Sequence, residues 1–137
     1  MTDRIERSFN AQTMMHTLGA RLYSVSPGCV VITAPILPGS TQQHGFGHAG
    51  LTFAIGDSAA GYAALTLMPE ESEVLTAEMK INLLAPAKGD LLRATGKVIK
   101  PGGRLMVVQA EVDAIEGDKI TPIALLQGTM VPVAIRS

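Results

Sequence analysis

The chain has 137 residues, of which 47% are hydrophobic, and its 11 basic residues nearly balance its 12 acidic ones. That length suits one domain with one core, and the even charge argues against a nucleic-acid binder or a polybasic membrane segment. The lone cysteine, Cys29, excludes a disulfide framework, and we find neither a signal-peptide core nor a run of ~20 apolar residues that could span a membrane. We therefore expect one cytoplasmic domain over residues 1–137.

The first third of the chain predicts a helix followed by a hairpin. Its first residues show a moderately amphipathic pattern that ends before Gly19, and Pro27-Gly28 is typical of a turn between two strands. We expect one helix and two strands here, over residues 3–16, 20–26 and 29–36. A polar, glycine-rich loop follows.

Residues 48–67 predict the principal helix. Apart from His48 at its start, Asp57 is its only acidic or basic residue, so the helix is apolar on nearly every side. A helix of this kind has to be buried almost all round. Because one sheet face covers only one side, either the sheet wraps around the helix or a second subunit covers the remainder.

The second half of the chain predicts an antiparallel sheet. Apolar and polar side chains alternate strictly in residues 75–84, which is typical of a strand with one buried face. The apolar set is Leu75, Ala77, Met79, Ile81 and Leu83. We expect three more strands, over residues 91–99, 105–114 and 120–134. Because the connecting turns are short, consecutive strands should pair as antiparallel hairpins, and one long buried helix against such a sheet is an α+β architecture.

Asp57 is the first candidate for a functional residue. Burying a carboxylate in an apolar helix is costly and raises its pKa, so such a group is usually retained because it has a partner or a task. The alternative is a helix position that happens to reach solvent. Asp57 lies about 13 Å along the axis from the start of its own helix, too far to act with the N–H groups there.

Small residues recur at helical spacing on the Asp57 side of this helix, and small side chains let another helix approach closely. The set is Gly50, Ala54, Ala60, Gly61 and Ala64. If a twofold axis sets two copies antiparallel, Asp57 of one chain comes near the helix start of the other. We therefore expect a homodimer.

The helix start, His48-Ala49-Gly50, is the second candidate. Its unpaired N–H groups and the positive end of the helix dipole can hold a thioester carbonyl and stabilise the oxyanion that develops on attack. Asp57 could then attack directly or take a proton from the attacking water. Two simpler interpretations stay open: that Gly47 and Gly50 only serve a tight turn, and that His48 only caps the helix.

These motifs resemble the PaaI-like, phenylacetate-degradation type of hotdog-fold acyl-CoA thioesterases. The resemblance rests on residues 42–50 (Gln-Gln-His-Gly-Phe-Gly-His-Ala-Gly), residues 57–61 (Asp-Ser-Ala-Ala-Gly) and residues 76–87, and it covers almost the whole chain in the order and spacing of elements. It implies a hotdog fold, in which a curved antiparallel sheet wraps one long central helix. It also implies homodimers, often paired into homotetramers, with the active site between two subunits.

The resemblance further implies roles for single residues. Asp57 would be the nucleophile or general base, and the N–H of Ala49 would bind the oxyanion. Gln42 and His48 would help to place the thioester or the water, and Thr76 would orient water. Many members of the family have His-Gly-Gly at the helix start, where this chain has alanine second; the change keeps the backbone N–H but narrows the pocket mouth.

Substrate binding is expected at Gly50 and at two basic residues, Lys88 and Arg104, whose loops could meet the phosphates of coenzyme A. We expect no cofactor, since coenzyme A is part of the substrate, and no metal. His44 and His48 are four residues apart, but the glycines between them disfavour a helix and no third ligand lies nearby in the chain.

The sequence thus predicts hydrolysis of acyl-CoA thioesters with an aryl or medium-chain acyl group. A non-catalytic acyl-CoA or small-ligand binding module of the same fold is the alternative. Hydration or dehydration of an enoyl or hydroxyacyl thioester is a further rival. Enzymes of that kind generally place Asp and His five residues apart on one chain, whereas no histidine follows Asp57 here.

Overall fold

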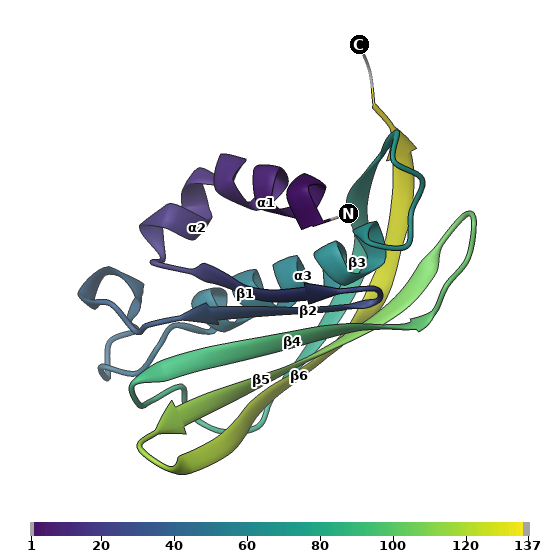
Figure 1. Ribbon diagram of the computed structural model, residues 1–137. Helices are drawn as coiled ribbons and strands as arrows, with labels where there is room; N and C mark the ends of the chain where they lie inside the picture. Colours follow the sequence, from purple (N-terminus) through teal and green to yellow (C-terminus); the bar gives the residue numbers. More distant parts are fainter. Residues whose placement is uncertain (1, 136–137) are drawn as a thin grey trace.

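The computed structural model describes residues 2–135, in which two short helices and a hairpin precede a long helix and four long strands (Figure 1). The helical elements are α1 (Thr2–Ala11), α2 (Thr13–Thr17), the 3-10 turn η1 (Pro38–Ser40) and α3 (Ala49–Leu65). The strands are β1 (Arg21–Ser26), β2 (Cys29–Ala34), β3 (Ser72–Leu83), β4 (Leu91–Lys100), β5 (Met106–Glu116) and β6 (Lys119–Ala134). The prediction of a single opening helix over residues 3–16 is wrong in one respect: the helix is broken at Gln12, whose backbone is extended.

The strands form one antiparallel sheet in the order β1-β2-β4-β5-β6-β3. The predicted hairpins β1–β2, β4–β5 and β5–β6 are confirmed. The hairpin predicted between residues 75–84 and 91–99 is wrong, because β3 pairs with β6 and β4 pairs with β2. Residues 84–90 instead carry the chain across the sheet, which curves around α3 (Figure 1). This is the expected α+β hotdog fold.

The sheet and α3 touch backbone to backbone. A Cβ atom at Gly96 of β4 would lie 2.3 Å from the carbonyl carbon of Ala59, so only glycine fits at this crossing. On the helix side, a Cβ at Gly56 would lie 2.9 Å from Leu126 of β6. This packing leaves the apolar residues of α3 that face the sheet without solvent contact, among them Ile55, Ala59, Ala60, Ala63 and Ala64.

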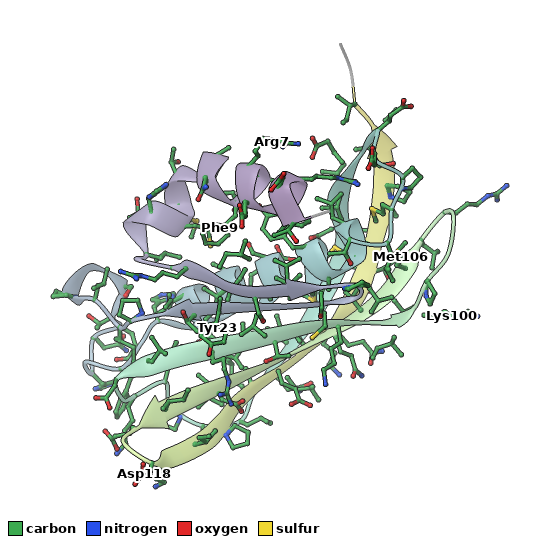
Figure 2. The ribbon with its side chains drawn as sticks, in the orientation of Figure 1. Arg7, Phe9, Tyr23, Lys100, Met106 and Asp118 are labelled. Carbon is green, nitrogen blue, oxygen red and sulfur yellow. The ribbon has the colours of Figure 1, made fainter. Side chains whose placement is uncertain are left out.

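The helix α1 covers the outer side of α3. Phe9 points from α1 towards α3 (Figure 2), and its ring lies 6.4 Å from that of Tyr62. The buried Tyr62 hydroxyl accepts a hydrogen bond from Gln12 at 2.7 Å and shares another with Ser8 at 3.0 Å. The opening helix is thus interrupted at Gln12, the residue whose side-chain amide bonds to Tyr62. The sheet covers one side of α3 and α1 covers another.

The small residues predicted to face a second subunit divide between two environments. The C-terminal members are buried within the chain itself: Ala60, Gly61 and Ala64. The N-terminal members are accessible, since Ala54 and Asp57 are half-buried and Gly50 is exposed. The expectation that the whole stripe faces a partner is therefore wrong, and only its first half is open to one.

A β-bulge interrupts β3. Its register with β6 shifts between Thr76 and Glu78, so that Ala77 is an extra residue in the ladder. Strict alternation would set Thr76 and Met79 on opposite faces. With the bulge, Thr76 reaches the side chain of Asp57 on α3 and Met79 packs against the core.

The apolar side chains of β3 consequently do not form the single buried face that alternation predicts. Met79 and Ile81 pack against the core, but Leu75 and Leu83 are 55% and 57% exposed. Two causes combine: the bulge reverses the alternation, and β3 is an edge strand, paired with β6 alone within the described chain. Its outer edge offers unpaired backbone groups and exposed leucines.

We predict that Gly96→Ala lowers the free energy of unfolding by about 1–3 kcal/mol, because the added methyl group has to displace the backbone of α3. Urea unfolding curves of the variant and the wild type measure the change. Gly103→Ala is the matched control, since a Cβ there meets nothing within 4 Å and should change stability by less than about 0.5 kcal/mol. Equal stability of the two variants would contradict the direct contact between α3 and β4.

Candidate active site

The loop before α3 is held in place by its own hydrogen bonds. Gln42 spans it: its N–H donates to the carbonyl of Phe46 at 2.8 Å, and its Oε1 accepts from the N–H groups of His44 and Phe46. Gly47 then donates to the carbonyl of Ala87 at 2.7 Å, and a Cβ at Gly47 would lie only 3.0 Å from that of Ala87. The loop is therefore fixed against Ala87.

His48 is the N-cap of α3. Its Nδ1 accepts a hydrogen bond from the N–H of Gly50 at 2.8 Å, and a Cβ at Gly50 would lie 2.9 Å from that nitrogen. His48 therefore caps the helix and Gly50 leaves room for that cap, whereas a further role of these residues in catalysis stays a prediction. The cap also has a chemical consequence: with Nδ1 accepting, a neutral His48 carries its proton on Nε2, which is then a donor.

The backbone N–H of Ala49 is a hydrogen-bond donor that the helix itself leaves without an acceptor. The N–H groups of Gly50, Leu51 and Thr52 all bond to His48. For the N–H of Ala49 we find no partner within residues 2–135, as is usual for the first residue of a helix. Ala49 is exposed, so its N–H and the positive end of the helix dipole are available to an oxyanion.

A groove of about 590 Å³ opens at this point. The part of the groove at the start of α3, which we call its head, is lined by Gln42, His48, Ala49 and Thr52. The remainder is apolar and comes from the loop, from residues 83–87 and from β6: Phe46, Gly47, Leu83, Leu84, Ala85, Pro86, Ala87 and Ile123. A cavity of this size with few polar groups is typical of a site for a small organic molecule.

Asp57 lies beside the edge strand β3, on a half-buried strip of α3 that stays partly accessible to solvent. Its Oδ1 accepts a hydrogen bond from the hydroxyl of Thr76 at 2.8 Å. Burial raises the pKa of Asp57 above its ordinary value of 3.8, and the Thr76 hydroxyl, which stabilises the carboxylate, opposes part of that rise. Asp57 is thus half-buried and held by Thr76 but still reaches solvent, so its catalytic role stays a prediction.

The structure brings Asp57 and Thr76 together, and it brings Gln42, His48 and Ala49 together, but it does not join the two sets within one chain. Asp57 does not line the groove. It lies eight positions after Ala49 in the helix, which is about 12 Å along the axis. This separation agrees with the distance expected from the sequence.

The two basic residues expected to bind phosphate lie far apart. Lys88 is exposed beside the groove and lines an adjoining cavity, near the sheet end marked by Asp118 in Figure 2. Arg104 is exposed in the β4–β5 loop, at the end marked by Lys100. The length of β4 separates the two ends by roughly 30 Å, so one chain does not bring both residues to one ligand.

Sequence reasoning missed the wall of the groove. Ile123 and Leu84 are distant from the motif in the chain, and no local pattern connects them with it. Phe46 stands inside the motif of residues 42–50 and could have been noticed as its one large apolar side chain.

Within the described range, no group of three or more His, Cys, Asp and Glu side chains is placed to hold a metal ion, and His44 is exposed in its loop. None of the helices in residues 2–135 combines the length and hydropathy needed to cross a membrane. That catalysis needs no metal or cofactor stays a prediction.

Comparisons with known proteins agree with this geometry. A model of the thioesterase superfamily matches residues 44–121. A thioesterase family protein from Silicibacter pomeroyi has a similar structure, with a TM-score of 0.95 at 40% identity over 98% of both chains. A protein of Saccharolobus solfataricus that is provisionally named an esterase is 30% identical over 114 residues, which cover 82% of this chain and 81% of that protein.

The E. coli PaaI protein, from the phenylacetic acid degradation operon, shares the fold, with a TM-score of 0.84 at 22% identity over 96% of this chain and 92% of its own. The chain belongs to the thioesterase superfamily and has its hotdog fold. It is accordingly a thioester hydrolase, and the resemblance to hotdog-fold thioesterases found in the sequence is confirmed, while with PaaI itself the chain shares the fold.

We predict that Asp57→Asn stabilises the protein at neutral pH. Because burial raises the pKa of Asp57, the folded state binds the proton more tightly than the unfolded chain. The contribution of Asp57 to the unfolding free energy of the wild type therefore falls as pH rises through its folded-state pKa, and it is unaffected below its unfolded pKa near 3.8. Asparagine avoids the charge and can still accept from Thr76.

Thermal melts across pH measure this effect: the advantage of Asp57→Asn should be present at pH ~7 and vanish towards the ordinary carboxyl pKa. Asp113→Asn is the control, and it should not raise the Tm. Asp113 is ion-paired with Arg93 at 3.2 Å, so removing its charge does not stabilise the protein. A lower Tm for Asp57→Asn at neutral pH would contradict the buried, costly carboxylate.

Proposed function

We propose that this enzyme hydrolyses acyl-CoA thioesters with an aryl or medium-chain acyl group, releasing the free acid and coenzyme A. The observation that carries the proposal is the unpartnered N–H of Ala49 at the head of an apolar groove. A thioester carbonyl bound there develops its negative charge against a helix N-terminus. An apolar acyl group finds matching surface in the rest of the groove.

Asp57 promotes the attack on the thioester carbonyl, in one of two ways. As a general base, its carboxylate takes a proton from water while the water oxygen attacks the carbonyl carbon; the carbon–sulfur bond then breaks and the thiolate of coenzyme A leaves and is protonated. As a nucleophile, the carboxylate attacks the carbonyl itself, the carbon–sulfur bond breaks and the thiolate of coenzyme A leaves and is protonated; water then cleaves the resulting anhydride, which releases the free acid and regenerates the carboxylate of Asp57. In both cases the raised pKa of Asp57 makes the carboxylate a better base than an ordinary aspartate.

Three polar side chains assist. The Nε2–H of His48 and the amide of Gln42, both at the head of the groove, are suited to orient the thioester. Thr76 holds the carboxylate of Asp57 and, with it, the attacking water. Gly50 keeps the His48 cap in place, because any side chain at position 50 would collide with the imidazole.

We further propose that the active site is shared across a homodimer. The edge strand β3 supports this proposal, because its free edge in the described chain and its exposed leucines form a surface suited to pairing with a second copy. If two β3 edges pair antiparallel about a twofold axis between Met79 and Lys80, Thr76 of one chain stands opposite Leu83 of the partner subunit. Leu83 lines the groove, so Asp57, which Thr76 holds, would approach the partner's Ala49.

Such a dimer also accounts for the half-buried strip of α3 that the single chain leaves open. A dimer of dimers is the expected larger assembly. Lys88 and Arg104, which are far apart in one chain, remain the basic residues proposed to meet the coenzyme A phosphates.

We predict that Asp57→Ala loses about 10²–10⁴-fold in kcat on the best substrate, because removal of a general base or nucleophile removes that step's main assistance. Free-thiol release from a panel of acyl-CoAs measures it. Asp113→Asn changes another half-buried carboxylate on the outer face of the sheet and should keep turnover near that of the wild type.

Wild-type turnover by Asp57→Ala would contradict the role of Asp57. Tight binding of coenzyme A by the wild type, with no turnover of any thioester in the panel, would instead favour the binding module over the enzyme.

A further inference from the structure

Phe46 stands between two cavities. It lines the groove at the helix start and also a second cavity of about 220 Å³. Ala85 and Pro86 line both as well, so these three residues form the wall between them. Behind the wall, the second cavity is lined by Lys88, Ala114, Glu116, Lys119 and Thr121.

The wall is rigid. The N–H of Phe46 bonds to Gln42 Oε1 at 3.3 Å, and its carbonyl accepts from the N–H of Gln42 at 2.8 Å. The next residue, Gly47, is fixed to Ala87 by a 2.7 Å hydrogen bond and by close contact. Phe46 is itself half-buried. These contacts hold the backbone of the wall between the two cavities, in which the ring of Phe46 is the largest side chain.

The groove in front of Phe46 is suited to hydrocarbon more than to the pantetheine arm of coenzyme A. Three of the backbone donors that line it beyond Ala49 are already used: the N–H groups of Leu84 and Ala85 donate to the carbonyl of Ile123, and Gly47 donates to Ala87. The two amide groups of pantetheine would find few partners there, and a buried polar group without a partner is costly. An acyl chain needs none.

We infer that Phe46 is the end wall of the acyl-binding groove and limits the length of the acyl group that the enzyme accepts. The inference rests on the proposed function, in which the thioester carbonyl is held by the N–H of Ala49 and the acyl group runs from there towards Phe46. Removing the ring joins the groove to the second cavity, which gives a longer chain additional apolar contact at Ala85, Pro86 and Ala114.

The test is kcat/KM for straight-chain acyl-CoAs from butanoyl to hexadecanoyl, measured for the wild type, Phe46→Leu and Phe46→Ala. In Phe46→Ala the optimum should move to longer chains, with a relative gain of roughly fourfold for each methylene newly buried. Phe46→Leu should move it less. Leu84→Ala is the matched control: it truncates another large apolar side chain of the groove that does not border the second cavity, so the chain-length optimum should stay where it is.

A change by the same factor at every chain length in both Phe46 variants would overturn the inference, because it would mean that the groove holds the part of the substrate common to all acyl-CoAs. Circular dichroism checks folding, and if Phe46→Ala does not fold, the Phe46→Leu series decides. Failure of the wild type to hydrolyse any acyl-CoA would contradict the proposed function itself, and the inference with it. That result differs from an active wild type whose chain-length profile does not respond to position 46.

Discussion

The enclosure of α3 is the constraint on which the rest of the structure depends. A helix that is apolar on nearly every side has to be covered on nearly every side, and here the sheet curves around it while α1 closes over Tyr62. The sheet approaches so closely that Gly96 meets the helix backbone. One strip remains uncovered, along the N-terminal half of α3 beside the free edge of β3, and Asp57 lies on it.

The same strip explains how a costly carboxylate can be kept. Asp57 is buried enough for its pKa to rise, yet it stays accessible because the covering strand is an edge strand. The bulge at Ala77 turns the hydroxyl of Thr76 onto it without taking Met79 out of the core. A site that faces the outside of a subunit in this way is completed by whatever pairs with that edge, which in our account is a second copy of the chain.

Much of this arrangement could be predicted from the sequence. Periodicity located α3 and the strands to within a few residues, and the isolated carboxylate and the helix start indicated the two halves of the proposed site. What the sequence could not reveal depends on non-local contacts: that β3 pairs with β6, that a bulge reverses its alternation, and that Ile123 completes the groove. Strand order and bulges are set by how the sheet closes on the helix, and no local pattern in residues 75–90 records them.

The central claim is that each active site takes Asp57 from one chain and the N–H of Ala49 from the other. Its most direct test mixes two inactive variants, Asp57→Ala and Ala49→Pro. Proline is well tolerated at position 49, because it is the first residue of α3, its N–H has no partner in the described chain, and His48 before it is extended at φ −63° and ψ 143°.

After the subunits are unfolded together and refolded in equal amounts, random pairing makes half of the dimers heterodimers, each with one intact site of two. The account predicts recovery of roughly a quarter of wild-type thioesterase activity. Native mass spectrometry confirms that heterodimers have formed. No recovery despite heterodimer formation would contradict the shared site and assign both groups to a single chain.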